Sequence, residues 1–262
     1  MERLAPVVVV SNQKGGVGKT TTVVNLAAYA GLAGLQVIVV DSDLQANATS
    51  GLTTTPYEHS IYTSAEAVPT SADGVRLVPA GSSLPDQVAP LAHRPVSELR
   101  NRIQPLRSQA DLILIDCPPN LTLLPTNALV AATHLLVPLQ SEYFALEGLS
   151  QLLAHVDALR QDHQLNLELC GILLTMATPG SPLSRSVEAE VRRHFTQGVF
   201  NAVIPRDESA AAAPSHAKAL VDHDPLAPSA LAYLAATREL LQRLSLAPRP
   251  TTTDPRSPGA MP

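Results

Sequence analysis

A glycine-rich loop that carries two lysines is the stretch of this sequence best suited to chemistry. Residues 11–22 read SNQKGGVGKTTT, which places Lys14 and Lys19 five positions apart around three glycines. Glycine lets backbone N–H groups turn inward toward phosphate oxygens, and a lysine in such a loop reaches the same phosphates. The stretch therefore predicts a nucleotide-binding phosphate loop that has one lysine more than such a loop requires.

Each position of this loop has a predicted contact. An apolar run, VVVV, precedes the loop and a helical pattern begins at about Gly18, so the helix N-terminus adds its partial positive charge. We expect Lys19 to contact the β- and γ-phosphates and the Thr20 hydroxyl to bind Mg²⁺. The predicted nucleotide-binding residues of the loop are Lys14, Gly15, Gly16, Val17, Gly18, Lys19, Thr20 and Thr21.

Three carboxylates follow apolar runs elsewhere in the chain. Asp41 and Asp43 come at the end of the run 36–40, and Asp116 follows the run 112–115 as LILID, a Walker B pattern. Ligands bind at the carboxyl ends of the strands in open α/β sheets, so we expect these side chains near the loop. Buried like charges are costly without a cation nearby, which Mg²⁺ supplies. The predicted metal-site residues are Thr20, Asp41 and Asp116.

Predicted strands and helices, which must position these residues, alternate along the chain. Strands are predicted for the nearly continuous apolar runs at 7–10, 36–40, 112–115, 134–139, 169–175 and 199–204, with a weaker strand at 75–79. Helices are predicted at 19–33, 142–161, 184–196 and 228–246, and near 96–108. The alternation predicts an α/β fold with a doubly wound, mostly parallel sheet and helices on both faces, as in P-loop NTPases.

The domain organisation predicted from the sequence is simple. Residues 1–246 are expected to form a single domain, in which 50–110 is the least regular part because it is rich in Ser, Thr and Pro. The segment 247–262 is rich in Pro and Thr and lacks an apolar period, so it is expected to be a disordered tail.

Composition narrows the class of protein. The chain has 262 residues, 45% of them hydrophobic, and a formal net charge of −5, which argues against a protein that is basic overall. It has two cysteines, which give no disulfide framework, and no signal-peptide pattern or apolar run of membrane-spanning length. We therefore expect a soluble cytoplasmic protein.

The loop resembles that of a known family. Its first glycine position holds Gln13, and it fits the pattern K-G-G-x-G-K-[ST] of the deviant Walker A ATPases, which include the ParA/Soj partitioning proteins. VVDSDLQANATSGL resembles the ParA/Soj motif V-D-x-D-P-Q-G-N-A-T-S-G-L, and IDCPPNLTLLPTNAL resembles I-D-C-P-P-S-L-G-L-L-T-x-N-A-L. IPRDESAAAAPSHAK resembles I-P-R-N-V-R-L-S-E-A-P-S-H-G-K. The resemblance runs from about Val7 to Leu246.

The resemblance implies a mechanism and partners. Lys14 is implied to contact the phosphates of ATP bound to a partner subunit, as an arginine finger does. Asp43 is implied to position or activate the attacking water, so Lys14, Lys19 and Asp43 are the expected catalytic residues, with ATP and Mg²⁺ as cofactors. The family cycle implies an ATP-bound homodimer that binds double-stranded DNA without sequence preference. A ParB-type partner then stimulates hydrolysis. Such a protein would associate with the nucleoid.

The sequence also departs from these motifs. Leu44 and Ala46 replace the Pro and Gly that follow the second aspartate. By resemblance, Pro205 and Asp207 flank adenine, although Asn is common at the second position. The family arginine of the DNA surface aligns with Ser209. The remaining candidates for contact with DNA are Arg185, Arg192, Arg193, Arg206 and Lys218.

Other functions within the same family are alternatives. A ParA-like positioner of a protein cargo would use the same switch, and a MinD-like regulator would cycle on a membrane. The end of this chain has no basic amphipathic stripe of the kind that lies on lipid, so we expect no membrane partner. A metal-cluster reductase would need cysteine ligands, but Cys117 lies in the Walker B turn and Cys170 within a strand pattern, and both are expected to be core thiols.

Overall fold

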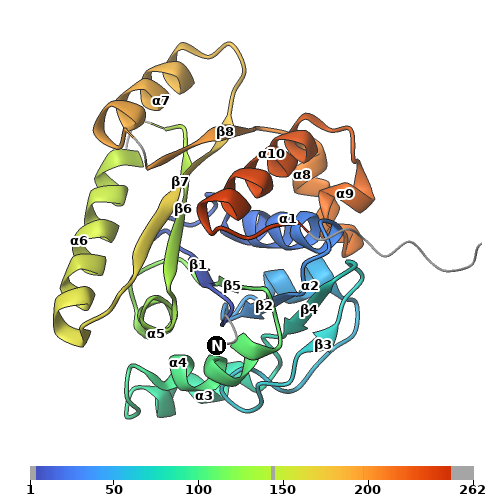
Figure 1. The fold of residues 1–262 in the computed structure, drawn as a ribbon, viewed down its shortest axis with the longest axis vertical. Helices are drawn as coiled ribbons and strands as arrows, with labels where there is room; N and C mark the ends of the chain where they lie inside the picture. The colour runs from blue at the N-terminus through green and yellow to red at the C-terminus, as the bar shows by residue number, and fades with distance from the viewer. Residues whose placement is uncertain (1–3, 143–144, 197, 249–262) are drawn as a thin grey trace, which may run out of the picture.

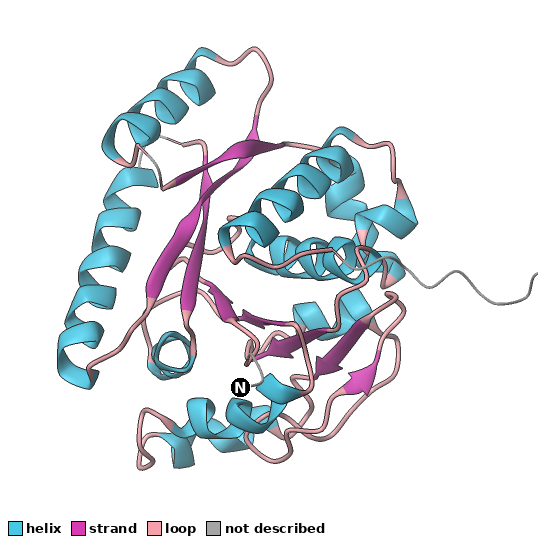
Figure 2. Cartoon of the chain, viewed as in Figure 1, coloured by secondary structure: helices cyan, strands magenta, loops and turns pink. Residues whose placement is uncertain are grey.

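One eight-stranded sheet organises the part of the chain that the computed structural model describes, residues 4–142, 145–196 and 198–248 (Figures 1 and 2). The strand order is β3-β4-β2-β5-β1-β6-β7-β8, and all neighbours are parallel except β3 and β4. The strands are β1 (Val7–Val10), β2 (Val37–Asp41), β3 (Val68–Pro69), β4 (Val75–Val78), β5 (Leu112–Asp116), β6 (His134–Gln140), β7 (Glu168–Ala177) and β8 (Val199–Pro205).

Helices cover both faces of this sheet because each central strand is apolar on both sides. Val7 and Val9 pack in one hydrophobic cluster, whereas Val8 and Val10 pack in the other. The first cluster includes α3 (Leu84–Leu91), α4 (Glu98–Ile103), α5 (Leu123–Ala131), α6 (Ala145–His163) and α7 (Pro182–His194). The second includes α1 (Lys19–Leu32), α2 (Asn47–Leu52), α9 (Leu220–His223) and α10 (Pro228–Arg243). The short helices are η1 (Gln104–Ser108), α8 (Glu208–Ala212) and η2 (Ala213–His216).

The predicted fold class is confirmed, and each predicted strand is present, whereas the two-residue strand β3 was not predicted. Several helices were not predicted: α2, α3, α5, α8 and α9. Helix α2 has the sequence NATSGL, whose small polar residues have low helix propensity, so tertiary contacts must support it. Helix α5 is uniformly apolar and contains Pro125 in its first turn, so it lacks a helical period in the sequence.

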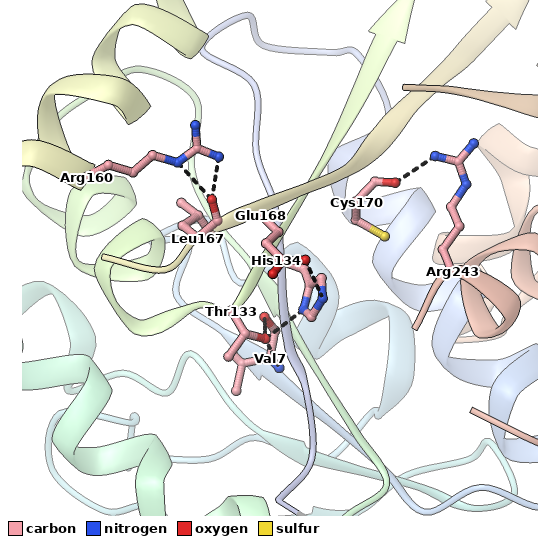
Figure 3. A network of polar contacts seen from close by, with 8 residues as sticks. All are labelled: Val7, Thr133, His134, Arg160, Leu167, Glu168, Cys170 and Arg243. Atoms are coloured by element: carbon pink, nitrogen blue, oxygen red, sulfur yellow. Dashed lines mark hydrogen bonds and ion pairs between the residues drawn. The ribbon is translucent and has the colours of Figure 1, made fainter. Parts of the chain in front are cut away.

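Polar contacts fasten the amino ends of the central strands (Figure 3). The Thr133 hydroxyl, just before β6, donates to the Val7 carbonyl at 3.0 Å and accepts from the Val7 amide at 2.9 Å. Near the end of α6, Arg160 Nε donates to the Leu167 carbonyl at 2.8 Å. These contacts satisfy backbone groups where strands begin, at the edge of the sheet opposite the phosphate loop.

Two alanines adopt the left-handed backbone conformation, which favours glycine. Ala46 has φ of 50° and Ala217 has φ of 50°. Both occupy positions where the resembling ParA/Soj motifs have glycine. A Cβ in this conformation lies too close to the following carbonyl oxygen, which costs about 1–2 kcal/mol.

Replacing either alanine by glycine should therefore raise the free energy of unfolding by about 0.5–1 kcal/mol. The gain is smaller than the strain relieved because glycine also makes the unfolded chain more flexible. Urea unfolding followed by circular dichroism measures it. Ala189→Gly, the same change on the exposed side of α7, should instead destabilise by about 1 kcal/mol. Ala46→Gly and Ala217→Gly variants that both lost stability would contradict this interpretation.

Residues 1–3 and 249–262, at the two ends of the chain, lie outside the described residues. The predicted disordered tail, 247–262, falls outside the described residues from position 249 onward. Among the helices that are described, none combines the length and apolar character needed to cross a membrane.

Candidate nucleotide site at the carboxyl ends of the central strands

The predicted site residues meet where β1, β2 and β5 end. The phosphate loop leaves β1, which pairs with β5, and leads into α1; β5 in turn pairs with β2. Asp41 and Asp116 are the last residues of β2 and β5 and lie opposite each other in the strand register. Asp43 follows two residues later and is also buried. The topology thus brings residues up to 100 positions apart to one edge of the sheet, as expected for parallel strands.

The phosphate loop is held in shape by its surroundings. Gly16 and Gly18 have φ of 72° and 87°, a backbone conformation that other residues adopt at a cost. The buried Asn12 amide donates to the Pro138 carbonyl at 2.8 Å, and its oxygen accepts from the Lys14 amide at 3.0 Å. On the other side, the Thr175 hydroxyl donates to the Val17 carbonyl at 2.9 Å. The loop is therefore preorganised by neighbouring strands.

Lys19 lies inside this loop. Its side chain is buried, and its ammonium donates to the Lys14 carbonyl at 3.0 Å. Burial lowers the pKa of Lys19, and the nearby acidic groups of Cys117, Asp116 and Asp43 act in the opposite direction. A buried ammonium enclosed by a loop of backbone amides is a suitable partner for phosphate oxygens.

Asp116 offers an unused acceptor beside Thr20. The Thr20 hydroxyl donates to Asp116 Oδ2 at 2.8 Å, whereas Asp116 Oδ1 is buried and has no hydrogen-bond partner in the described structure. Burial raises the pKa of Asp116 well above its ordinary value, and the charge of Asp41 raises it further. An orphaned carboxylate oxygen next to a hydroxyl is an oxygen donor set of the kind that Mg²⁺ and its bound waters prefer.

Asp41 is engaged with α2 through both of its oxygens. Oδ1 accepts from the Asp43 amide at 3.0 Å, and Oδ2 accepts from the amide and the hydroxyl of Thr49, each at 2.8 Å. Burial raises the pKa of Asp41 to about 6, although these hydrogen bonds act against the rise. Asp41 thus fastens the first turn of α2 to the site, which explains how that polar helix forms.

Lys14 lies at the rim of the loop and faces away from Lys19. Its ammonium forms an ion pair with Glu142, and the two side chains remain 49% and 45% exposed. Gln13, the residue before it, donates to the Gly148 carbonyl at 2.9 Å and to the Gln151 side chain at 2.8 Å. Two consecutive loop residues therefore connect the phosphate loop to the start of α6.

A pocket of about 320 Å³ opens beside the loop. Its lining includes both residues predicted to flank adenine, Pro205 and Asp207, together with Met176 and Tyr233. The Asp207 carboxylate accepts from the amides of Ser209 and Ser229, both at 3.0 Å. Asp207 therefore shapes the pocket by fixing the starts of α8 and α10. The lining is mostly apolar, which suits a planar base.

Three of the five predicted DNA contacts, Arg185, Arg192 and Arg193, lie on α7, whereas Arg206 follows β8 and Lys218 follows η2. On α7, Arg192 pairs with Glu188 at 2.9 Å and Arg193 pairs with Glu190 at 2.6 Å, so both guanidinium charges are partly neutralised. The Arg185 side chain donates to the Gly180 carbonyl at 3.0 Å, and the Arg206 amide donates to the Ala177 carbonyl at 2.9 Å. Arg185 and Arg206 thus flank the loop between β7 and α7. Lys218 lines a different pocket, between α1 and α2.

Ser209, which aligns with the family arginine, has a local structural contact instead. Its hydroxyl donates to Asp224 Oδ2 at 2.9 Å, joining α8 to the residue after α9. The loss of the arginine is therefore accompanied by a new anchor, and no positive charge replaces it at that position.

Both cysteines are core thiols. Cys117 and Cys170 are buried, and burial raises the pKa of each to about 12. Among the described residues, no group of three or more His, Cys, Asp or Glu side chains is arranged to hold a metal ion.

The native chain should accordingly be inert to Ellman's reagent at pH 8, because only the thiolate attacks and burial disfavours it. In guanidinium chloride both thiols should titrate, giving two equivalents per chain. The absorbance of released thionitrobenzoate measures the reaction, and fast labelling of one thiol in the native chain would contradict this account.

Three residues with contacts to the site were not singled out from the sequence: Gln13, Thr49 and Glu142. Gln13 was noted only because it departs from the usual glycine. Thr49 contacts Asp41, eight residues earlier within the resembling motif VVDSDLQANATSGL, whereas the contact of Glu142 with Lys14 spans 128 residues, so no local pattern reveals it.

Comparison with known proteins places the chain in a family. A family model described as an AAA domain matches residues 5–169. The chain is 42% identical over 243 residues to the chromosome-partitioning ATPase Soj of Thermus thermophilus, covering 90% of this chain and 96% of that protein. It is 37% identical over 250 residues to the sporulation initiation inhibitor protein Soj of Bacillus subtilis, covering 90% and 98%.

A solved structure shares the architecture. Cobyrinic acid a,c-diamide synthase from Mycobacterium smegmatis, solved with a bound ATP analogue and magnesium, superposes with a TM-score of 0.80 at 30% identity and covers 96% of this chain and 100% of that one. Because its relatives are this similar, and because the phosphate loop and the three carboxylates agree with them, the chain belongs to the ParA/Soj family of chromosome-partitioning ATPases.

Proposed function

We propose that this chain is a Mg²⁺-dependent ATPase that closes into a homodimer on ATP and uses the closed state to move DNA. The observation that carries the proposal is the different position of the two loop lysines. Lys19 is buried inside its own phosphate loop, whereas Lys14 lies half-exposed at the rim with its ammonium directed at Glu142. A lysine placed there is available to a second subunit.

The chain's own residues would divide the work of hydrolysis. The loop amides and Lys19 would bind the phosphates, and the apolar pocket beside Pro205 would take the base. Asp43, buried next to the loop, would orient the attacking water and accept its proton. Lys14 from the partner subunit would stabilise charge on the transferred phosphoryl group.

The residues present fit a magnesium ion. Thr20 and Asp116 would hold it, since Asp116 has an unpartnered buried oxygen and its other oxygen already contacts the Thr20 hydroxyl. Asp41 would support this shell from the opposite strand without direct contact, because Thr49 and the Asp43 amide occupy its oxygens. A bound Mg²⁺ would neutralise phosphate charge and the two raised-pKa carboxylates.

Family membership supports a proposal for the cargo and the partner. We propose that the ATP dimer binds double-stranded DNA without sequence preference, on the nucleoid within the cytoplasm, and that a ParB-type protein stimulates hydrolysis. Arg185 and Arg206, which flank one loop, are the strongest candidates for phosphate contacts. Arg192 and Arg193 contribute less because each pairs with a glutamate on its own helix.

DNA binding by Asp43→Ala, a variant that should stay in the ATP state, tests this proposal. Anisotropy of a labelled 40-base-pair duplex would be measured with Mg-ATP and with Mg-ADP across a salt series. ATP-dependent binding should weaken with salt, each phosphate contact adding about 0.9 to the slope of log K against log salt. Adding Arg185→Ala and Arg206→Ala should flatten that slope, whereas Arg94→Ala, which pairs with Glu98 far from this loop, should not.

Two other outcomes would point to the alternatives. A chain that dimerises on ATP but never binds DNA would be a positioner of a protein cargo. Sedimentation with anionic liposomes in the presence of ATP would favour a MinD-like membrane cycle.

A further inference from the structure

We propose that a groove between the start of α6 and α7 is the docking site for the partner that stimulates hydrolysis. The segment that docks there would carry an apolar side chain next to a basic one, and its cation would take Glu142 from Lys14. This inference rests on the proposed function, because it names the surface through which a partner acts on the ATPase site.

The groove combines an apolar floor with an acidic rim. It encloses about 480 Å³ and is lined by Glu142, Leu146, Glu147, Leu183, Ser186, Val187 and Glu190. Figure 1 shows α7 next to the first turn of α6. Gln13 of the phosphate loop contacts Gly148 and Gln151 in the same part of α6. Leu183 is 48% exposed, so an apolar side chain is accessible at the edge of this groove.

The residues of α7 in this groove form one stripe. Leu183, Ser186, Val187 and Glu190 are spaced i, i+3, i+4 and i+7, so they share one face of the helix. Val187 at the centre of the stripe is buried, and Leu183 at its end projects toward solvent. Such a stripe can receive an apolar anchor at one end and a polar contact at the other.

The charged residues that line the groove indicate which kind of partner can bind there. The rim carries Glu142, Glu147 and Glu190, and no lysine or arginine is among the described residues that line the groove. Two of these carboxylates already attract cations of this chain, since Glu142 pairs with Lys14 and Glu190 pairs with Arg193. A DNA phosphate would be repelled here, whereas an arginine or lysine of a partner protein would find complementary charge. The groove therefore fits a protein partner and not the DNA.

The position of Glu142 connects the groove to the ATPase site. Its carboxylate holds the Lys14 ammonium, the group that the proposed mechanism sends to the other subunit. Gln13 also ties the loop to α6 through Gly148 and Gln151. In the ATP dimer a partner cation at Glu142 would keep that carboxylate from drawing Lys14 back, so docking in the groove would hold Lys14 on the phosphates of the second subunit.

The test uses the full chain and the purified ParB-type protein of the same organism. Binding is measured by biolayer interferometry in Mg-ATP, alongside ATPase rate with and without that protein. Leu183→Ser and Glu147→Lys should each weaken binding by about tenfold and reduce stimulation in proportion, while basal turnover and ATP-dependent dimerisation stay unchanged. Leu226→Ser, at an exposed leucine before α10, and Asp162→Lys, at the far end of α6, are matched controls that should behave as wild type.

The possible results separate this inference from the proposed function. If the wild type neither binds the ParB-type protein nor responds to it, the proposed partner fails and the docking site with it. If the wild type responds and both groove variants respond equally, the groove is not the docking site although the function stands. If the groove variants lose ATP-dependent dimerisation, the groove belongs to the second copy of this chain, which also overturns the inference.

A second variant tests the link through Glu142. Glu142→Gln removes the anion that holds Lys14, so ATP-dependent dimerisation should occur at a protein concentration a few-fold lower without any partner. Stimulation by the ParB-type protein should shrink by a similar factor, because docking then has no ion pair to prevent. The factor is small because an exposed ion pair is weak. Analytical ultracentrifugation with Mg-ATP provides the measurement. Unchanged dimerisation and unchanged stimulation would show that docking does not act through Lys14.

Discussion

Replacing Lys14 by alanine is expected to lower ATP turnover by about 1000-fold and to leave the binding of Mg-ATP unchanged. The reason is geometric: Lys19, and not Lys14, fills the interior of the loop, so removing Lys14 leaves the chain's own phosphate cradle intact. ATP-dependent dimerisation should be lost as well, because the variant no longer offers a cation to the second subunit. Turnover is measured by phosphate release, nucleotide affinity by a fluorescent ATP analogue, and dimerisation by light scattering.

Lys218→Ala is the matched control for this experiment. It removes the one other lysine of the chain outside the loop, an exposed side chain that follows η2. In the absence of DNA it should hydrolyse ATP at the wild-type rate. A Lys14→Ala chain that dimerised normally on ATP would refute the contact between subunits. A chain that no longer bound ATP would mean that Lys14 serves its own loop.

Replacing Asp43 by alanine is expected to lower turnover by at least about 100-fold while the ATP-bound dimer accumulates. Asp43 is buried at the edge of the sheet, and one of its oxygens accepts from the Gln45 amide at 2.9 Å. That hydrogen bond fixes the carboxylate, while the phosphate loop and the Asp116–Thr20 pair do not depend on it. Binding should therefore survive while the chemical step fails.

Single-turnover hydrolysis and size-exclusion chromatography with Mg-ATP would follow this variant. Asp86→Ala, which removes an exposed aspartate in the first turn of α3, should leave both the rate and the elution volume unchanged. Hydrolysis at an undiminished rate by Asp43→Ala would refute the role proposed for this carboxylate. A loss of nucleotide binding would show that the residue instead supports the loop.

The sequence predicted the fold and the centre of the site because both depend on local patterns. The strands that carry the site, β1, β2 and β5, are continuous apolar runs, and the loop and the carboxylates follow these runs directly. The parallel topology then brings the strand ends together without further information. The same reasoning could not predict helix α2, whose polar residues form a helix because the Asp41 carboxylate accepts from Thr49.

Long-range side-chain contacts could not be predicted from the sequence for a different reason. Lys14 and Glu142 are 128 residues apart, and Gln13 and Gly148 are 135 apart. Which glutamate meets the exposed lysine depends on how α6 enters the fold, and a surface ion pair leaves no periodic trace in the sequence. The left-handed backbone of Ala46 and Ala217 was also hidden, since alanine does not signal positive φ.

The ion pair between Lys14 and Glu142 would affect the protein concentration at which two chains assemble. The proposed ATP dimer, if it has two-fold symmetry, would break the pair once in each chain, so the free energy of that contact would count twice. An exposed pair worth about 0.5 kcal/mol would then change the dimer dissociation constant by about fivefold. Modest changes in ionic strength weaken such a pair and would shift the concentration at which the two chains assemble. A weak surface contact would thus set the assembly threshold.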